Sequence, residues 1–168
     1  MISSDVGVTA LPVGKGDLLS PAKVKVHINY AITRQKDTFK VVLCIDSECT
    51  DINVTKTRIE GLAREMVTLF RSLSVKAVVV DHSLEGWLLC DRQGVAEFLG
   101  ITLRRLLRYG DPDQECRPAD LMGKVFLRAG KDFVKAEALA DLARRIDHDQ
   151  LARLNPTFKE FQLAILEN

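Results

Sequence analysis

Acidic side chains gather just after two apolar segments of this sequence. Asp46 and Glu48 follow the apolar run VVLCI, and Glu85 lies shortly beyond the run VKAVVV. Crowded carboxylates repel one another unless they are protonated or bound to a cation, and a set of oxygen ligands suits a hard ion such as Mg²⁺. Asp46, Glu48 and Glu85 are therefore candidate ligands of a magnesium ion, or of manganese in its place.

Simpler roles compete for the polar residues at the same strand ends. Asp and Asn after a strand often cap the next helix or form a turn, and this interpretation is favoured for Asp51 and Asn53. A lone histidine such as His82 is more often a hydrogen-bonded residue than a metal ligand, and Asp81 belongs to the same turn. For Asp46 and Glu48, which alternate at the strand end, a functional role is favoured instead.

Hydrophobic periodicity predicts a scaffold that brings these strand ends together. Residues 6–13, 39–45 and 75–82 are predicted strands. The second is continuously apolar after Lys40, and the third is apolar over 77–80, as in a sheet covered by helices on both faces. Residues 20–35 and 54–73 are predicted helices between them. Strands that alternate with helices predict a parallel sheet with right-handed crossovers, so the predicted fold class is α/β.

The second half of the chain is predicted to be helical. Residues 1–168 are expected to form a single domain, with an α/β sheet core over 1–83 and helical additions packed on it over 84–168. The predicted helices of this half cover residues 84–99, 101–108, 118–129, 133–146 and 157–167.

Composition excludes several classes of protein. The 168 residues suit one domain with a proper core, and 24 basic against 23 acidic side chains give a net charge of +1. A polybasic nucleic-acid binder is excluded, so any nucleic-acid contact needs a local basic patch.

The four cysteines show neither zinc-binding spacing nor a disulfide framework, which fits reduced thiols. Without a leader or an apolar run near the roughly 20 residues of a membrane helix, a soluble cytoplasmic protein is expected.

Ordered motifs link the acidic strand end to the rest of the chain. CIDSE (44–48) is followed by HSLEGWLLCD (82–91), FVK (133–135) and NPTFKEF (155–161). A strand that ends in such an acidic pair resembles the Toprim domain of primases, topoisomerases and overcoming-lysogenization-defect nucleases. The ordered set is similar to an uncharacterised bacterial and archaeal Toprim-like family with Glu-x-Trp-Leu-Leu-x-Asp, aromatic-x-Lys and Pro-x-Phe motifs, and the likeness covers about residues 6–166.

The resemblance implies roles for individual residues. In Toprim enzymes an Asp pair and an earlier Glu hold Mg²⁺, which neutralises charge on the phosphoryl oxygens and activates a nucleophile. Asp46 matches the first Asp, Glu48 matches the second with one more methylene, and Glu85 matches the Glu of Glu-x-Trp. Lys135 matches the Lys of aromatic-x-Lys; a phosphate contact and a place on a solvated helix face with Lys131 and Arg128 explain it equally well.

The earlier Glu of the family has no counterpart here. Family members carry it after an initial strand, whereas the first glutamate of this chain is Glu48. Either the sequence starts after the first strand and helix of the fold, or this member has lost the residue. In both cases the predicted metal site is incomplete.

Two functions follow from the resemblance. The first is magnesium-dependent processing of nucleic-acid phosphodiesters, a nuclease-like activity. The alternative is a catalytically inert interaction or dimerisation module that partners an ATPase, because relatives in the family accompany ATPases. A homodimer is conceivable as well, because a sheet without its first strand exposes an edge that can pair with a second copy. A small-nucleotide binder also fits the fold, but the sequence lacks a glycine-rich fingerprint.

Two other features of the sequence have structural explanations. Trp87 lies among leucines and is predicted to be a core anchor, not a platform for base stacking. Arg104, Arg105 and Arg108 form the densest basic stretch, and an amphipathic helix with exposed arginines explains it as well as a binding role does.

Overall fold

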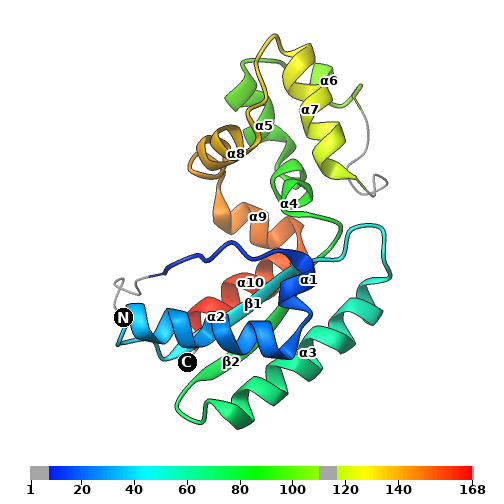
Figure 1. Cartoon of the computed structure of the whole chain (residues 1–168). Coiled ribbons are helices and arrows are strands. Elements are labelled where there is room, and N and C mark those ends of the chain that lie inside the picture. The colour runs from blue at the N-terminus through cyan, green and yellow to red at the C-terminus, as the bar shows by residue number, and fades with distance from the viewer. Residues whose placement is uncertain (1–7, 110–116, 168) are drawn as a thin grey trace.

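A two-stranded parallel sheet lies at the centre of the α/β body of the protein (Figure 1). The computed structural model describes residues 8–109 and 117–167, together with their side chains except those of residues 135 and 136. Strand β1 (Lys40–Asp46) pairs with β2 (Ser74–Val80) along its whole length. The α/β fold class is therefore confirmed, with the sheet packed against helices and a mostly helical second half.

The two long helices on one side of the sheet form where the sequence predicts them. Helix α1 (Lys15–Leu18) leads into α2 (Pro21–Arg34), and α3 (Ile52–Leu69) makes the crossover between the strands. The Asp51 carboxylate caps α3 by accepting a hydrogen bond from the Asn53 N–H at 2.7 Å, which confirms capping as the role of Asp51.

The predicted first strand is wrong over the part that the structure describes. Residues 8–13 have no strand structure, and residues 6–7 lie outside the described residues. Almost all of this segment is exposed, so strand pairing would gain little burial, and Pro12 has no N–H for a ladder hydrogen bond. The segment is held instead by side chains, since Gln35 Nε2 donates to Thr9 Oγ1.

Short helices make up the rest of the chain, and the predicted helix at 84–99 is in fact two. Asp91 separates them, because its carboxylate accepts a hydrogen bond from the Gly94 N–H at 3.0 Å and so starts a new helix. None of the described helices is long and apolar enough to cross a membrane. The helices are α4 (Leu84–Cys90), α5 (Arg92–Leu99), α6 (Leu103–Leu106), α7 (Pro118–Arg128), α8 (Lys135–Ala143), α9 (His148–Leu154) and α10 (Pro156–Leu166).

Figure 1 shows α5 to α8 gathered in a lobe apart from the sheet, which we call the helical lobe, while α10 returns to the body. Two apolar clusters match this division. The body cluster is aliphatic and lies between the sheet and helices α2 and α3, with Ile59 and Met66 fully buried. The lobe cluster begins at Val80 on the other face of the sheet and continues through Trp87 to Phe126.

Candidate functional site

Hydrogen bonds tie together the two peptide segments that follow β1 and β2. The Ser47 N–H donates to the Val80 carbonyl at 2.9 Å, and the Glu48 N–H donates to the His82 carbonyl at 2.8 Å. In return the His82 N–H donates to Ser47 Oγ at 2.8 Å, and His82 Nδ1 lies 2.9 Å from the Glu48 carbonyl oxygen. The carboxyl edge of the sheet is therefore a connected unit of backbone and side chain.

Two residues of this edge have left-handed backbone conformations. The φ angles of Glu48 and His82 are 53° and 60°, which are uncommon for residues other than glycine. Such conformations cost free energy and persist only where the surroundings hold them, as the hydrogen bonds between these segments do. Strained backbone of this kind gathers at functional sites, so the edge is a candidate site on structural grounds as well.

The predicted metal ligands occupy different environments. Asp46 is half-buried at the end of β1, Glu85 is 2% exposed in the first turn of α4, and Glu48 is an exposed residue. Glu48 Oε2 lies 3.0 Å from Lys15 Nζ, and its side chain is 64% exposed. The carboxylate of Glu48 is thus already neutralised by a cation of the chain itself.

These carboxylates do not come together as a metal site in this arrangement. Among the described residues, no group of three or more His, Cys, Asp or Glu side chains is placed to hold a metal ion. A three-carboxylate site at Asp46, Glu48 and Glu85 would require Glu48 to leave Lys15. Magnesium binding by these residues stays a prediction.

The cysteines near the edge are not set up as nucleophiles. Burial, and then the charge of Asp46, raise the pKa of the Cys44 thiol to about 12, so it stays protonated at neutral pH. Cys44 and Cys90 are not in disulfide bonds, whereas Cys49 is, so the expectation of reduced thiols is wrong for Cys49.

Trp87 is a core anchor, as predicted. It is 4% exposed, and its Nε1–H donates to Thr157 Oγ1 at 2.7 Å. Its ring makes an edge contact with Phe158 at 5.2 Å between centroids and lies 5.3 Å from Phe161. The Glu-x-Trp and Pro-x-Phe motifs therefore meet in space and pack against each other.

The remaining motif residues also have packing or capping roles. Asn155 Oδ1 caps α10 by accepting from the Phe158 N–H at 2.9 Å, and Phe133 lies 5.0 Å from Phe126 between ring centroids. Lys135 is the first residue of α8, and its side chain lies outside the part of the chain that the structure describes. The phosphate contact of Lys135 therefore stays a prediction.

A second candidate site lies on the helical lobe, where cations surround two half-buried aromatic rings. Around Tyr109, Arg105 Nε donates to the phenol oxygen at 2.8 Å, and Arg128 Cζ lies 5.0 Å from the ring centroid. Arg105 Nη2 also donates to the Arg128 carbonyl at 2.7 Å. Each guanidinium is thereby held in place by neutral groups.

Around Phe98 the arrangement repeats. Lys131 Nζ donates to the Phe98 carbonyl at 2.7 Å and lies 5.0 Å from the centroid of its ring. Arg145 Cζ lies 5.3 Å from the same centroid. Cation–π contacts of this kind are attractive and leave polar hydrogens available to a further partner. We call the following set the cation surface: Arg105, Arg128, Lys131 and Arg145.

Glycine turns end the two helices that carry Phe98 and Arg128. Gly130 has a φ of 73° and closes α7, so that the Lys131 N–H donates to the Phe126 carbonyl at 3.0 Å. Gly100, with a φ of 70°, closes α5 in the same way. Both are Schellman motifs, which need a left-handed residue that glycine supplies at least cost.

The cation surface is not neutralised by nearby acids. Within the described residues, none of its four side chains forms an ion pair with a carboxylate. All four residues are exposed. A group of unpaired like charges raises the local positive potential and attracts anions.

Sequence reasoning found only part of this surface. The basic stretch at 104–108 is explained equally well by a binding role and by an amphipathic helix with exposed arginines, but α6 is only four residues long. Phe98 lies in α5 and Arg145 follows the end of α8, and neither residue carries a sequence signal of its own. The glycines that end α5 and α7 were the available sign that these segments turn back toward one another.

Comparison with known proteins gives no match: no protein-family model, no curated protein and no solved structure matches this chain. The Toprim-like resemblance therefore stays a prediction.

Proposed function

We propose that this protein binds nucleic acid through the cation surface, which contacts the phosphate backbone. The observation that carries the proposal is that Arg105, Arg128, Lys131 and Arg145 are held by carbonyl groups and aromatic rings, and none pairs with a carboxylate within the described residues. Nucleic acid is one of the partners that the resemblance implies, and a local basic patch is what a chain of net charge +1 needs to bind it.

The chemistry of these side chains suits phosphodiesters. A guanidinium presents a planar fork of donors that matches two phosphate oxygens, and an ammonium binds phosphate as a point charge. Arg105 and Lys131 are already restrained by hydrogen bonds, so less side-chain entropy is lost when an anion binds. Contacts to the backbone alone predict binding with little sequence preference.

Fluorescence anisotropy with labelled single-stranded and duplex oligonucleotides tests the proposal. The double variant Arg128→Gln/Arg145→Gln should weaken binding by about tenfold or more at moderate salt, since it removes two phosphate contacts. Arg144→Gln is the matched control, because Arg144 neighbours Arg145 in the chain but pairs with Asp141 at 2.7 Å. Equal binding by the double variant and the wild type would refute the proposal, as would a preference for anionic lipid vesicles over oligonucleotides.

Magnesium-dependent processing of phosphodiesters, as in Toprim enzymes, is the second candidate function. The observation that favours it is the strained, hydrogen-bonded edge formed by Glu48 and His82 beside Asp46. A bound divalent ion would neutralise phosphoryl charge there. The proposal requires the Glu48 side chain to exchange Lys15 for the metal.

Thermal shift with millimolar Mg²⁺ or Mn²⁺ tests this second function through ligand linkage. The melting temperature should rise with metal, and Asp46→Asn should abolish the rise. Incubation with DNA and Mn²⁺ then separates cleavage from binding. Oligonucleotide binding with neither a metal response nor cleavage would place the protein in the inert interaction class, for which the resemblance implies an ATPase partner.

A further inference from the structure

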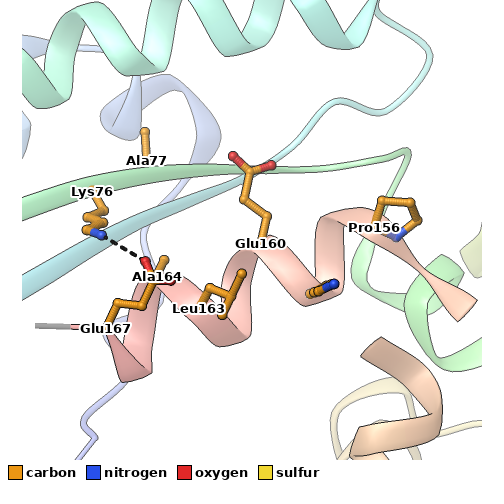
Figure 2. Close-up of a pocket in the computed structure, with 8 residues that line it drawn as sticks. Lys76, Ala77, Pro156, Glu160, Leu163, Ala164 and Glu167 are labelled. Atoms are coloured by element: carbon orange, nitrogen blue, oxygen red, sulfur yellow. Dashed lines mark ion pairs between the residues drawn. The ribbon is translucent and has the colours of Figure 1, made fainter. Parts of the chain in front are cut away.

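A groove of about 350 Å³ lies between β2 and α10, on the body and away from the cation surface. Figure 2 shows Leu163 and Ala164 of α10 in this groove, with the Lys76 to Glu167 ion pair at one end and Glu160 toward the other. The groove is lined by Lys76, Ala77, Pro156, Lys159, Glu160, Leu163, Ala164 and Glu167.

The outer edge of β2 borders the groove. Ser74 N–H and Val80 C=O hydrogen-bond toward β1, so the alternation of a strand turns the backbone groups of Val75, Ala77 and Val79 to the outer edge. In the described part of the chain, the backbone of these three residues makes no hydrogen bond to another element. Ala77 is only half-buried, so the edge is open at that point.

Helix α10 presents an exposed stripe beside this edge. Leu163 and Leu166 are 41% and 51% exposed, which leaves apolar surface in water. Lys159 precedes Leu163 by one helical turn and has no carboxylate partner among the described residues. Glu167, the C-cap of α10, follows Leu163 by the same number of residues, so the Cα atoms of two oppositely charged residues lie about 6 Å along the helix axis on either side of the leucine.

This order of charges is self-complementary. If a second α10 lies antiparallel to the first about a two-fold axis at Leu163, Lys159 faces Glu167 of the second copy, and the same contact recurs by symmetry. A two-fold interface requires a self-complementary surface, on which each residue of one copy contacts a residue of the second copy with compatible charge or polarity. We propose that the groove and the α10 stripe form the interface of a homodimer, in which α10 of the second copy covers Leu163 and the Ala77 edge.

The dimer interface is independent of the proposed nucleic-acid binding, because it uses α10 and β2 and none of the four cations of the cation surface. The ion pair between Lys76 and Glu167 does not prevent it. Their nitrogen and oxygen are 3.6 Å apart and the Glu167 side chain is 58% exposed, so the carboxylate has oxygens left for a second cation. An exposed ion pair of this kind contributes little by itself.

Analytical ultracentrifugation of the full chain over a concentration series tests the dimer. The wild type should show a concentration-dependent monomer–dimer equilibrium. Lys159→Glu places Glu opposite Glu167 twice in each dimer, and Glu167→Lys places Lys opposite Lys159 twice. Each single variant should raise the dissociation constant by about tenfold or more, because two attractive contacts become repulsive.

The double variant Lys159→Glu/Glu167→Lys restores opposite charges across the axis and should recover most of the dimer. Leu163→Ser should also dissociate it, while Leu127→Ser, an exposed leucine of the helical lobe, serves as the control and should not. Circular dichroism shows whether each variant is folded. A wild type that stays monomeric at every soluble concentration would overturn the proposal, and so would a dimer that both single charge reversals leave intact.

Discussion

Cations of the α/β body and cations of the helical lobe's cation surface have different partners. In the body, Lys15 meets the carboxylate of Glu48 and Lys56 meets that of Glu160. On the cation surface of the lobe, guanidinium and ammonium groups instead meet carbonyl oxygens and aromatic rings. A net charge of +1 is therefore compatible with a basic surface whose cations do not pair with carboxylates, because net charge does not report how the charges are distributed over the molecule.

The two regions also differ in how they are packed. The body cluster is built from aliphatic side chains around a parallel sheet, while the lobe cluster places Phe98, Phe126 and Phe133 in contact. In the lobe, the same aromatic network that fills the core also carries the cations, since Lys131 and Arg145 lie on the ring of Phe98. Stability and binding should therefore be coupled in the lobe and separate in the body.

The largest expected effect tests that coupling. Phe126→Ala removes a buried ring that lies 5.0 Å from Phe133 and 5.9 Å from Phe98 between centroids. It should lower the free energy of unfolding by about 3–5 kcal/mol and also weaken oligonucleotide binding. Ile59→Val in the body should cost only about 0.5–1.5 kcal/mol and leave binding intact. Urea unfolding and anisotropy measure the two quantities, and binding that survives Phe126→Ala in folded protein would break the comparison.

A pair of glycine substitutions gives effects of opposite sign in the two regions. A Cβ on Gly94 in the lobe would lie 2.4 Å from Asp91 Oδ2, so Gly94→Ala should displace the buried cap and cost about 1–2 kcal/mol. A Cβ on Gly61 in the body would meet only the Arg64 side chain at 3.9 Å, so Gly61→Ala should stabilise helix α3 by up to about 1 kcal/mol. Thermal denaturation of both variants checks the signs, and equal shifts would count against the packing described here.

Alkaline pH should destabilise the body through Cys44. Its pKa rises from 9.0 to about 12 on folding, so the folded protein favours the neutral thiol. The stabilisation is complete below pH 9 and declines as the pH rises toward 12. At one pH unit above the unfolded-state pKa, roughly 1 kcal/mol of the free energy of unfolding is lost. Cys44→Ala should lack this part of the pH dependence, which urea unfolding at pH 8 and pH 10 measures. Parallel pH profiles for the two proteins would contradict the assignment.

The smallest expected effect concerns the acidic edge. Because Lys15 and Glu48 form an exposed pair, Lys15→Ala should change the free energy of unfolding by less than about 1 kcal/mol. If the edge binds Mg²⁺, the same variant should bind it more tightly, since Glu48 is released. Isothermal titration with Mg²⁺ compares the two proteins, and weaker binding by Lys15→Ala would show that Lys15 does not compete with the metal.

The long elements of the body were predictable from sequence because their signals are local. The apolar runs of β1 and β2 and the helical spacing of α3 specify both the element and its buried face. The apolar residues of segment 8–13 also predict a strand, but the segment is exposed and forms none. Whether such a segment joins the sheet depends on its contacts with distant residues, which local sequence does not show. Helix α9, at seven residues, was too short to show a clear period.

The site features depend on contacts between distant residues, so the sequence could not specify them. The sequence predicts Glu48 at a strand end, but its partner Lys15 lies 33 positions away at the start of α1. The cation surface joins Arg105 of α6, Arg128 of α7, Lys131 after the end of α7 and Arg145 after the end of α8. The sequence shows these basic residues but not the surface that they form together. Its unpaired state is a property of the fold and not of any one segment.

The salt dependence of oligonucleotide binding tests the central claim most directly, because it counts the phosphates that the cation surface neutralises. For duplex DNA, the logarithm of the association constant should fall with the logarithm of salt concentration with a slope of about −3 to −4, as expected for four cations. Arg128→Gln/Arg145→Gln should reduce the magnitude of the slope by about two, whereas Arg64→Gln, whose side chain pairs with Glu60 in the body, should leave it unchanged. A slope near zero, or one that the double variant does not alter, would contradict the account.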